Sequence, residues 1–333
     1  MKLLYIPCHS IAEYDEIKLF SEIGIEVFST GSYFVPSKPV DPKRPPLNIK
    51  RHPEYEPLVG SNPEVIPREL VKNFDIVFFH WLPLRILNNW ENLKDRKVIL
   101  RTNGQSVSQN ELQIRELKKR GVIIVRYSPK ERNIPFYAGE DALIRFYKDP
   151  EEFKDWNGKK KRIISFCQSL LKRGPYCNAP VFLKATEGFE RKLFGPDNEE
   201  LKEIWGGCLD YEQLKKELQD NRVYFYTGTM PASYTLNFIE AFMTGIPIVS
   251  IGKKLGNPFW DSNLDLFEIG DLIENGKEGF VSDDLTNLKG YIKILLDDYS
   301  LAKEISKNAR EKAIELFGKE KIKRQWINFF KNL

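Results

Sequence analysis

The segment from residue 221 to 250, NRVYFYTGTMPASYTLNFIEAFMTGIPIVS, constrains the fold more than any other part of this chain. Val223–Tyr226 is a short aromatic and β-branched run, which is typical of a buried strand. From about Tyr234 apolar residues recur at helical spacing, with Ser233 as the predicted N-cap and Gly245 as the predicted stop. The segment therefore predicts a strand, a turn, a helix and a second strand.

This arrangement starts the predicted helix just beyond the carboxyl end of a strand. Ligands bind at that edge of open α/β sheets, and the free N–H groups and positive dipole end of a helix suit a phosphate. Glu240 lies about two turns into the helix among apolar neighbours. A buried carboxylate there needs a partner, whereas an exposed one would simply face solvent, and the periodicity alone allows both.

Length and composition indicate an ordinary globular protein. The 333 residues are enough for two domains that each bury a core, and the chain is 41% apolar and 29% charged. The net charge of +4 is compatible with binding a polyanion but does not by itself indicate it. Composition therefore excludes a disordered chain and leaves the ligand open.

Cysteine spacing and hydropathy indicate the cellular compartment and whether the chain crosses a membrane. The cysteines, Cys8, Cys167, Cys177 and Cys208, form no CxxC pair, and Cys8 and Cys167 lie in apolar strand-like runs, which predicts reduced buried thiols and a cytoplasmic protein. No apolar run reaches the roughly eighteen residues of a membrane span. We expect no integral membrane segment, while peripheral contact through basic residues remains open.

The order of apolar runs predicts parallel sheets. Leu3–Ile6, a helix over 17–23 and Ile25–Phe28 make a strand, helix, strand unit of the kind that opens a parallel sheet. Around residues 148–161 the chain becomes charged and turn-forming, which favours a domain boundary. We predict an α/β protein of two Rossmann-like parallel-sheet domains, over 1–155 and 156–318.

The end of the central segment resembles the donor-binding signature of the group-1 glycosyltransferases with the GT-B fold. In that family a Pro-Ser loop leads into a helix that ends Glu-Ala-x-x-x-Gly-x-Pro-Val-Val; here the string runs from Glu240 through Gly245 to Val249. The resemblance implies a cleft between two facing domains and a last helix, 319–333, that packs back on the first. It also implies that Glu240 grips the ribose and that the helix start holds the diphosphate of the sugar nucleotide, through Ser233, Tyr234, Thr235 and Leu236. The family's earlier Glu, which serves the sugar, is replaced by Ala232.

Two further stretches extend the resemblance on the donor side. Gln168–Gly174 looks like the family's Gly-Arg-Leu-x-x-x-Lys-Gly loop, whose cations neutralise the diphosphate; Lys172 and Arg173 would do so here, or else are ordinary solvated cations. In relatives, backbone groups at the positions of Gly207 to Leu209 face the nucleobase. The resemblance thus adds Lys172, Arg173, Gly207 and Leu209 to the expected donor site.

Candidate acid–base residues follow the early strands. His9, Glu13, Asp15 and Glu16 cluster after the first strand, where acidic groups ordinarily favour the helix dipole, but where His9, Glu13 or Asp15 could act as a general base. The apolar strand over 74–79 ends at His80, and the family's equivalent His lies beside the transferred sugar. His80 is therefore a site residue by resemblance, or otherwise a His that caps a loop.

The Pro-rich segment 36–68 carries scattered Lys and Arg around Tyr55. A loop of that length is uncommon unless it is functional or mobile, so it could cover an acceptor or touch nucleic acid, although a solvated loop is the ordinary reading. Three His without ligand spacing and acidic pairs at turns predict no metal site.

These features lead to one prediction and two alternatives. We predict a metal-independent, hexosyltransferase-like enzyme without a cofactor, which moves a sugar from a UDP- or GDP-linked donor to a hydroxyl of a glycan, lipid-linked or small-molecule acceptor. One alternative is phage-type transfer onto a DNA base, supported only by the basic Pro-rich segment. The other is a sugar-nucleotide-binding protein without transfer activity, which Ala232 and the substitution of Gln168-Ser169 for Gly-Arg would allow.

Overall fold

The computed structural model describes residues 1–30, 44, 64–104, 107–261 and 263–333. The chain forms two compact units, and we call Met1–Phe146 with Lys323–Leu333 unit 1 and Tyr147–Ile322 unit 2. The division between Phe146 and Tyr147 compares with a predicted boundary at residue 155, and the predicted last helix over 319–333 corresponds to the helix Lys319–Lys331. Most of the Pro-rich segment 36–68 lies outside the described residues.

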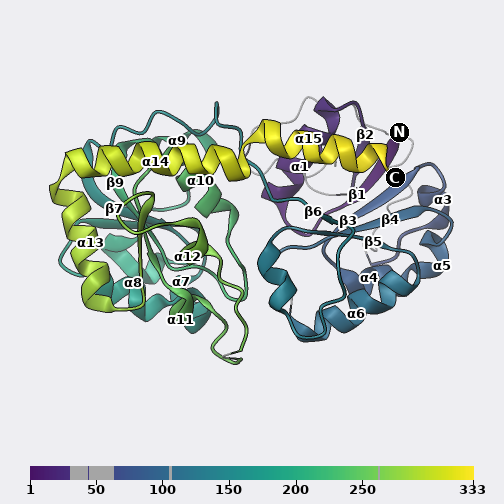
Figure 1. Ribbon diagram of the computed structural model, residues 1–333, viewed down its shortest axis with the longest axis horizontal. Helices are drawn as coiled ribbons and strands as arrows, with labels where there is room; N and C mark the ends of the chain where they lie inside the picture. Colours follow the sequence, from purple (N-terminus) through teal and green to yellow (C-terminus); the bar gives the residue numbers. More distant parts are fainter. Residues whose placement is uncertain (31–43, 45–63, 105–106, 262) are drawn as a thin grey trace. The chain divides into compact units, whose positions relative to one another are not determined.

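Unit 1 is built on a parallel sheet in the order β2-β1-β3-β4-β5-β6 (Figure 1). Its strands are β1 (Lys2–Ile6), β2 (Glu26–Ser29), β3 (Ile76–His80), β4 (Lys97–Arg101), β5 (Ile123–Arg126) and β6 (Ala142–Leu143). Its helices are α1 (Ser10–Glu22), α3 (Arg68–Val71), α4 (Pro83–Asn88), α5 (Trp90–Leu93), α6 (Ser108–Lys119), the 3₁₀ helix η1 (Pro129–Asn133) and most of α15 (Lys319–Lys331).

The central strands of unit 1 are buried on both faces, which explains their continuous apolar sequence. Val77 and Phe79 point into a core that includes Ile86 of α4 and Ile114 of α6. The intervening Phe78 points to the opposite face, where it packs against aromatic residues of α1 and α15. Helices therefore cover both faces and leave the carboxyl ends of the strands for loops.

Unit 2 is a second parallel sheet, in the order β11-β10-β9-β7-β8. Its strands are β7 (Lys160–Phe166), β8 (Arg191–Phe194), β9 (Asn221–Tyr226), β10 (Ile248–Ile251) and β11 (Gly279–Ser282). Its helices are α7 (Leu170–Arg173), η2 (Gly174–Cys177), α8 (Ala179–Ala185), η3 (Glu199–Ile204), α9 (Tyr211–Asp220), α10 (Leu236–Thr244), α11 (Lys253–Gly256), α12 (Ile269–Leu272), α13 (Leu285–Asp297) and α14 (Tyr299–Phe317). Two parallel-sheet α/β units confirm the predicted fold class.

Two local predictions were wrong. α1 begins at Ser10, so the acidic residues expected in a loop lie within a helix. α10 begins at Leu236 with Thr235 in the N-cap position, because the backbone of Ser233 is engaged elsewhere. The C-terminal helical region has one break at Asp298, whose carboxylate accepts a hydrogen bond from Leu301 N at 2.9 Å and caps α14, and another at Gly318.

The cysteine and membrane expectations have separate outcomes. All four cysteines are free, but Cys8 and Cys208 are exposed and only Cys177 is fully buried, so the prediction of a buried Cys8 was wrong. Cys8 lies two residues beyond the end of β1, outside the core that the strand enters. Within the described ranges, no helix combines the length and apolar character that crossing a bilayer requires.

Candidate functional site

In unit 2 the loops that follow β7 and β8 are joined by one buried side chain, Asn198. Its amide nitrogen donates to Cys167 O at 2.8 Å and to Gly195 O at 3.1 Å, and its oxygen accepts from Leu170 N at 2.7 Å. Gly195 has a positive φ, and a Cβ there would lie 2.5 Å from Cys167 O. Because the two loops approach so closely, they form one continuous rim at the carboxyl edge of the sheet.

The cations expected to bind a diphosphate lie on this rim. Lys172 and Arg173 form the last two residues of α7, the short helix that follows β7, with Lys172 exposed and Arg173 half-buried. Neither forms an ion pair with a described residue. Their predicted contact with a diphosphate remains a prediction.

Gly207 and Leu209 follow η3 beside β8. Gly207 has a positive φ, and its carbonyl accepts from Gly195 N at 3.0 Å, so it belongs to the same rim. Leu209 is half-buried two residues farther on. The structure thus brings the residues expected near the nucleobase to the β8 side of the loop that carries Lys172 and Arg173.

The loop between β9 and α10 is fastened at several points. Ser233 is buried, and its carbonyl accepts from Glu268 N at 3.0 Å. Tyr234 is also buried, with its ring 5.3 Å from that of Phe317 in an edge-to-face contact. Of the residues expected at the diphosphate, Ser233 and Tyr234 therefore present backbone rather than exposed side chains.

The start of α10 faces the end of β7. Thr235 does not cap the helix with its side chain; its hydroxyl lies 3.0 Å from the Tyr226 hydroxyl instead. Asn237, in the first turn, donates to Phe166 O at 2.9 Å, which brings α10 to the loop that carries α7. The half-buried Leu236 is the first helical residue. The uncapped turn and the α7 cations consequently lie on adjoining loops.

Glu240 has a protein partner that the sequence did not reveal. Its carboxylate lies 2.7 Å from the ammonium of Lys148, and the two side chains are 2% and 1% exposed. Lys148 follows the start of unit 2, where its backbone N–H donates to Phe317 O at 3.0 Å. In this structure Glu240 is therefore one half of a buried ion pair, and its predicted contact with ribose remains a prediction.

In unit 1 the predicted acid–base residues do not share one environment. His9 precedes α1 and is exposed, whereas Glu13 and Asp15 are buried within the helix. Glu13 accepts a hydrogen bond of 2.6 Å from the hydroxyl of Ser29 at the end of β2. His9 is thus the candidate base with the most open side chain.

Glu16 joins the strand ends of unit 1. It accepts hydrogen bonds from the Tyr5 hydroxyl at 2.5 Å and from Arg101 Nε at 3.0 Å. Burial raises the pKa of Glu16, although the Arg101 guanidinium and the Tyr5 hydroxyl act in the opposite direction. The carboxylate therefore links β1, α1 and β4, a structural role that its position in the sequence did not reveal.

His80 lies at the end of β3 and is buried. Its Nδ1 is 3.9 Å from the sulfur of Cys8, and its Nε2 has no hydrogen-bond partner among the described residues. Burial lowers the pKa of His80 well below its ordinary value, and the nearby His9 and Arg101 lower it further. His80 is therefore a neutral imidazole next to, but not exposed at, the carboxyl edge of the sheet.

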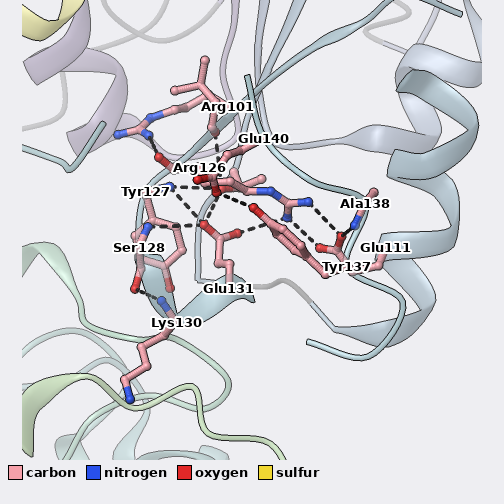
Figure 2. A network of polar contacts seen from close by, with 12 residues as sticks. Arg101, Glu111, Arg126, Tyr127, Ser128, Lys130, Glu131, Tyr137, Ala138 and Glu140 are labelled. Carbon is pink, nitrogen blue, oxygen red and sulfur yellow. Dashed lines mark hydrogen bonds and ion pairs between the residues drawn. The ribbon is translucent and has the colours of Figure 1, made fainter. Parts of the chain in front are cut away.

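A buried ionic network joins the ends of β4 and β5 (Figure 2). Arg126 binds the carboxylate of Glu111 through both Nη atoms, at 2.6 and 2.8 Å, and contacts Glu131 at 3.5 Å. Burial alone would lower the pKa of Arg126, but Glu111 and Glu131 outweigh it and raise the pKa. Glu131 in turn accepts from the hydroxyl of Thr102 at 2.8 Å. This network ties the residues that follow β4 to those that follow β5.

The structure brings together Lys172, Arg173, Gly207 and the residues from Ser233 to Leu236, all on loops at the carboxyl edge of unit 2. Sequence reasoning missed Asn198, Asn237 and Lys148, whose partners lie far away in the chain. No group of three His, Cys, Asp or Glu within the described ranges could hold a metal ion.

Comparisons with known proteins agree with this architecture. No family model and no curated protein sequence matches the chain. Sucrose-phosphate synthase from Thermosynechococcus elongatus superposes with a TM-score of 0.68 at 15% identity, over 100% of this chain and 98% of that one. Anabaena HepE in complex with UDP-glucose gives 0.65 at 13% identity, over 100% of both chains.

A glycosyltransferase from Rickettsia africae superposes with a TM-score of 0.61 at 12% identity, over 99% of this chain and 98% of that chain. These likenesses extend over both units and concern the backbone rather than the sequence. The chain therefore adopts the GT-B fold, built from two parallel-sheet α/β domains.

Proposed function

We propose that this protein is a glycosyltransferase that moves a sugar from a nucleoside diphosphate sugar, with a UDP-sugar as the first candidate, to an acceptor hydroxyl. The observation that carries the proposal is the junction of two loops in unit 2. Asn237 in the first turn of α10 is bound to the end of β7, so an uncapped helix start lies next to the loop of Lys172 and Arg173. Helix amides and cations together suit a diphosphate.

The order of strands suggests how the donor would lie. The diphosphate would bind between the loops after β7 and β9, which are neighbours in the sheet. Gly207 and Leu209 lie on the far side, next to β8, where a nucleobase would face backbone groups. HepE holds UDP-glucose in its solved structure, which supports UDP as the first nucleotide to test.

The reaction would need little covalent chemistry from the protein. The acceptor oxygen forms a bond to the anomeric carbon as the bond from that carbon to the diphosphate oxygen breaks. The acceptor proton passes to a base, and the bonding electrons leave with the nucleoside diphosphate. Lys172, Arg173 and the α10 amides would stabilise the negative charge that grows on the leaving group, without a metal.

For the acceptor proton, the exposed His9 is the strongest of the predicted bases, since Glu13 and Asp15 are buried in α1. His80 would act through its neutral imidazole, as a hydrogen-bonding group rather than a cation. The four free cysteines suit a reducing compartment, which supports a cytoplasmic enzyme.

A thermal-shift screen against UDP, UDP-glucose, GDP, ADP and their sugars tests the donor site. Ligand at about a hundredfold its Kd should stabilise the wild type by about 2.7 kcal/mol. The double variant Lys172→Ala/Arg173→Ala should lose most of that stabilisation, because it removes the cations that would face the diphosphate. A matched control, Lys303→Ala/Lys307→Ala on α14, removes the same charge from an exposed helix and should respond like the wild type.

A folded wild type that no nucleotide stabilises would contradict the proposal. Transfer itself requires a second readout, the release of nucleoside diphosphate from the bound donor in the presence of candidate acceptors. Binding without any release across glycan, lipid-linked and small-molecule acceptors would instead identify a sugar-nucleotide-binding protein.

A further inference from the structure

Three exposed aromatic rings form a cluster in unit 2 that the proposed diphosphate site does not use. Tyr176, Phe259 and Trp260 are 47%, 58% and 44% exposed. Tyr176 lies 5.4 Å from Phe259 and 5.5 Å from Trp260 between ring centroids, and Phe259 and Trp260 lie 5.0 Å apart. Large aromatic side chains that remain exposed as a group on a folded domain indicate a binding surface.

The cluster joins two different loops. Tyr176 belongs to η2, three residues after Arg173, while Phe259 and Trp260 follow α11. The base of this second loop is closed by Asn257, whose side-chain oxygen accepts from Leu266 N at 2.8 Å and Phe267 N at 2.7 Å. The rings therefore stand on supported backbone.

Both loops also hold the segment between β9 and α10. The Tyr176 carbonyl accepts from Met230 N at 2.8 Å. Asn178 donates to Thr227 O at 3.0 Å and to Leu255 O at 3.1 Å, which joins the η2 side to the α11 side. The ring cluster is thus part of the same assembly of loops as the start of α10.

Sheet order decides which part of a donor could reach the rings. The strands run β10-β9-β7-β8, with the proposed diphosphate position at the β7 and β9 loops and the proposed nucleobase position at β8. A nucleotide sugar carries its base and its sugar at opposite ends of the diphosphate. A base on the β8 side therefore places the sugar toward β10, the strand whose following loop supplies Phe259 and Trp260.

We infer that Tyr176, Phe259 and Trp260 form the subsite for the sugar ring of the donor, an inference that rests on the proposed function. The apolar C–H face of a pyranose packs against an aromatic ring, and such contact orients the sugar without charged groups. In the donor, the sugar is bonded directly to the diphosphate. Tyr176 correspondingly lies only three residues after Arg173, the cation proposed to bind that diphosphate.

Titration calorimetry with UDP and UDP-glucose on the full chain tests the inference. Trp260→Ala and Tyr176→Ala should each weaken UDP-glucose about tenfold while changing UDP by less than about twofold, because UDP lacks the sugar. Trp260→Phe should recover part of the loss. The matched control Ile294→Ala removes a similarly exposed apolar side chain from α13 and should bind both ligands like the wild type.

Equal weakening of UDP and UDP-glucose would overturn the inference, since the rings would then support the loop rather than the sugar. Unchanged binding of both ligands would overturn it as well, and leave the proposed function standing. A wild type that binds neither UDP nor UDP-glucose would remove the inference together with a UDP-dependent form of the proposed function.

Discussion

Buried ionisable side chains gather at the carboxyl ends of the strands in unit 1, where a loop-lined ligand edge was expected. His80, Glu16 and Arg101 are all within the core at this edge. Glu16 and Arg101 offset each other's charge, whereas burial, together with the nearby His9 and Arg101, lowers the pKa of His80 and keeps its imidazole neutral. The polar side chains at this edge therefore belong to the packed core of unit 1, in addition to any role in chemistry.

The depressed pKa of His80 predicts a pH dependence of stability. An unfolded His takes up a proton near its ordinary pKa of about 6.5, whereas folded His80 does not, so protonation favours the unfolded chain. The contribution of His80 to the free energy of unfolding is complete above about pH 6.5. Below that pH it falls by up to about 1.4 kcal/mol per pH unit, until the lowered pKa of the folded state is reached.

Urea unfolding of the wild type and of His80→Gln between pH 8 and pH 5 measures this contribution. The variant should lose stability less steeply than the wild type below about pH 6.5. The difference in unfolding free energy between the two proteins at pH 8 gives the packing cost of the substitution alone, since His80 is unprotonated there in both the folded and the unfolded chain. Parallel profiles for the two proteins would show that His80 binds a proton in the folded state.

At the scale of single elements, both local sequence signals and tertiary contacts decide where a helix begins. α9 follows its sequence closely, with Asp210 and Gln213 forming a capping box at its start. α10 instead begins where Asn237 meets β7, and it is held from behind by the pair of Glu240 and Lys148. The element expected to bind the donor is therefore anchored to the first residues of unit 2.

The buried Lys148–Glu240 ion pair predicts a strong energetic coupling between the start of unit 2 and α10. Glu240→Gln removes the carboxylate that neutralises a buried ammonium, so it should cost about 3–5 kcal/mol of unfolding free energy, and Lys148→Met should cost a similar amount. The double variant should be far less destabilised than the sum, because it buries no unbalanced charge.

A double-mutant cycle by urea unfolding checks this, with Lys154→Met and Glu151→Gln as the matched exposed pair, for which the coupling should be below about 1 kcal/mol. Additive losses at Lys148 and Glu240 would mean that the two charges are balanced independently. The cycle also shows which Glu240 variant remains folded enough for donor-binding experiments.

At the scale of the whole chain, the C-terminus belongs to unit 1. Trp326 of α15 is 1% exposed and lies 5.0 Å from Phe20 and 5.8 Å from Phe78 between ring centroids. The guanidinium of Arg101 lies 5.6 Å from the Trp326 ring. Residues from both ends of the sequence thus complete the same core.

Trp326→Ala should therefore destabilise unit 1 by about 3–5 kcal/mol, the usual cost of removing a buried Trp side chain. Hydrogen exchange should show faster exchange in β1, β3 and β4 and little change in β7 and β9. Phe329→Ala, a less buried residue of the same helix, should cost less. Equal deprotection in both sheets would contradict the assignment of α15 to unit 1.

Local pattern alone determined the central strands, the parallel sheets and the place of the central motif. Each buried strand is a short apolar run, and the Glu240–Val249 signature is contiguous, so both can be recognised without any long-range contact. The same locality makes Lys172 and Arg173 recognisable as candidates, because they belong to one contiguous loop sequence.

Only the tertiary structure decided which residues meet. Lys148 with Glu240, Asn198 with Cys167, Tyr176 with Trp260 and Trp326 with Phe20 come from separate elements. Residue type and local periodicity carry no information about such partners, because burial and pairing arise when the sheets assemble. Hence the start of α10, the burial of Glu13 and the ring cluster could not be derived from the sequence.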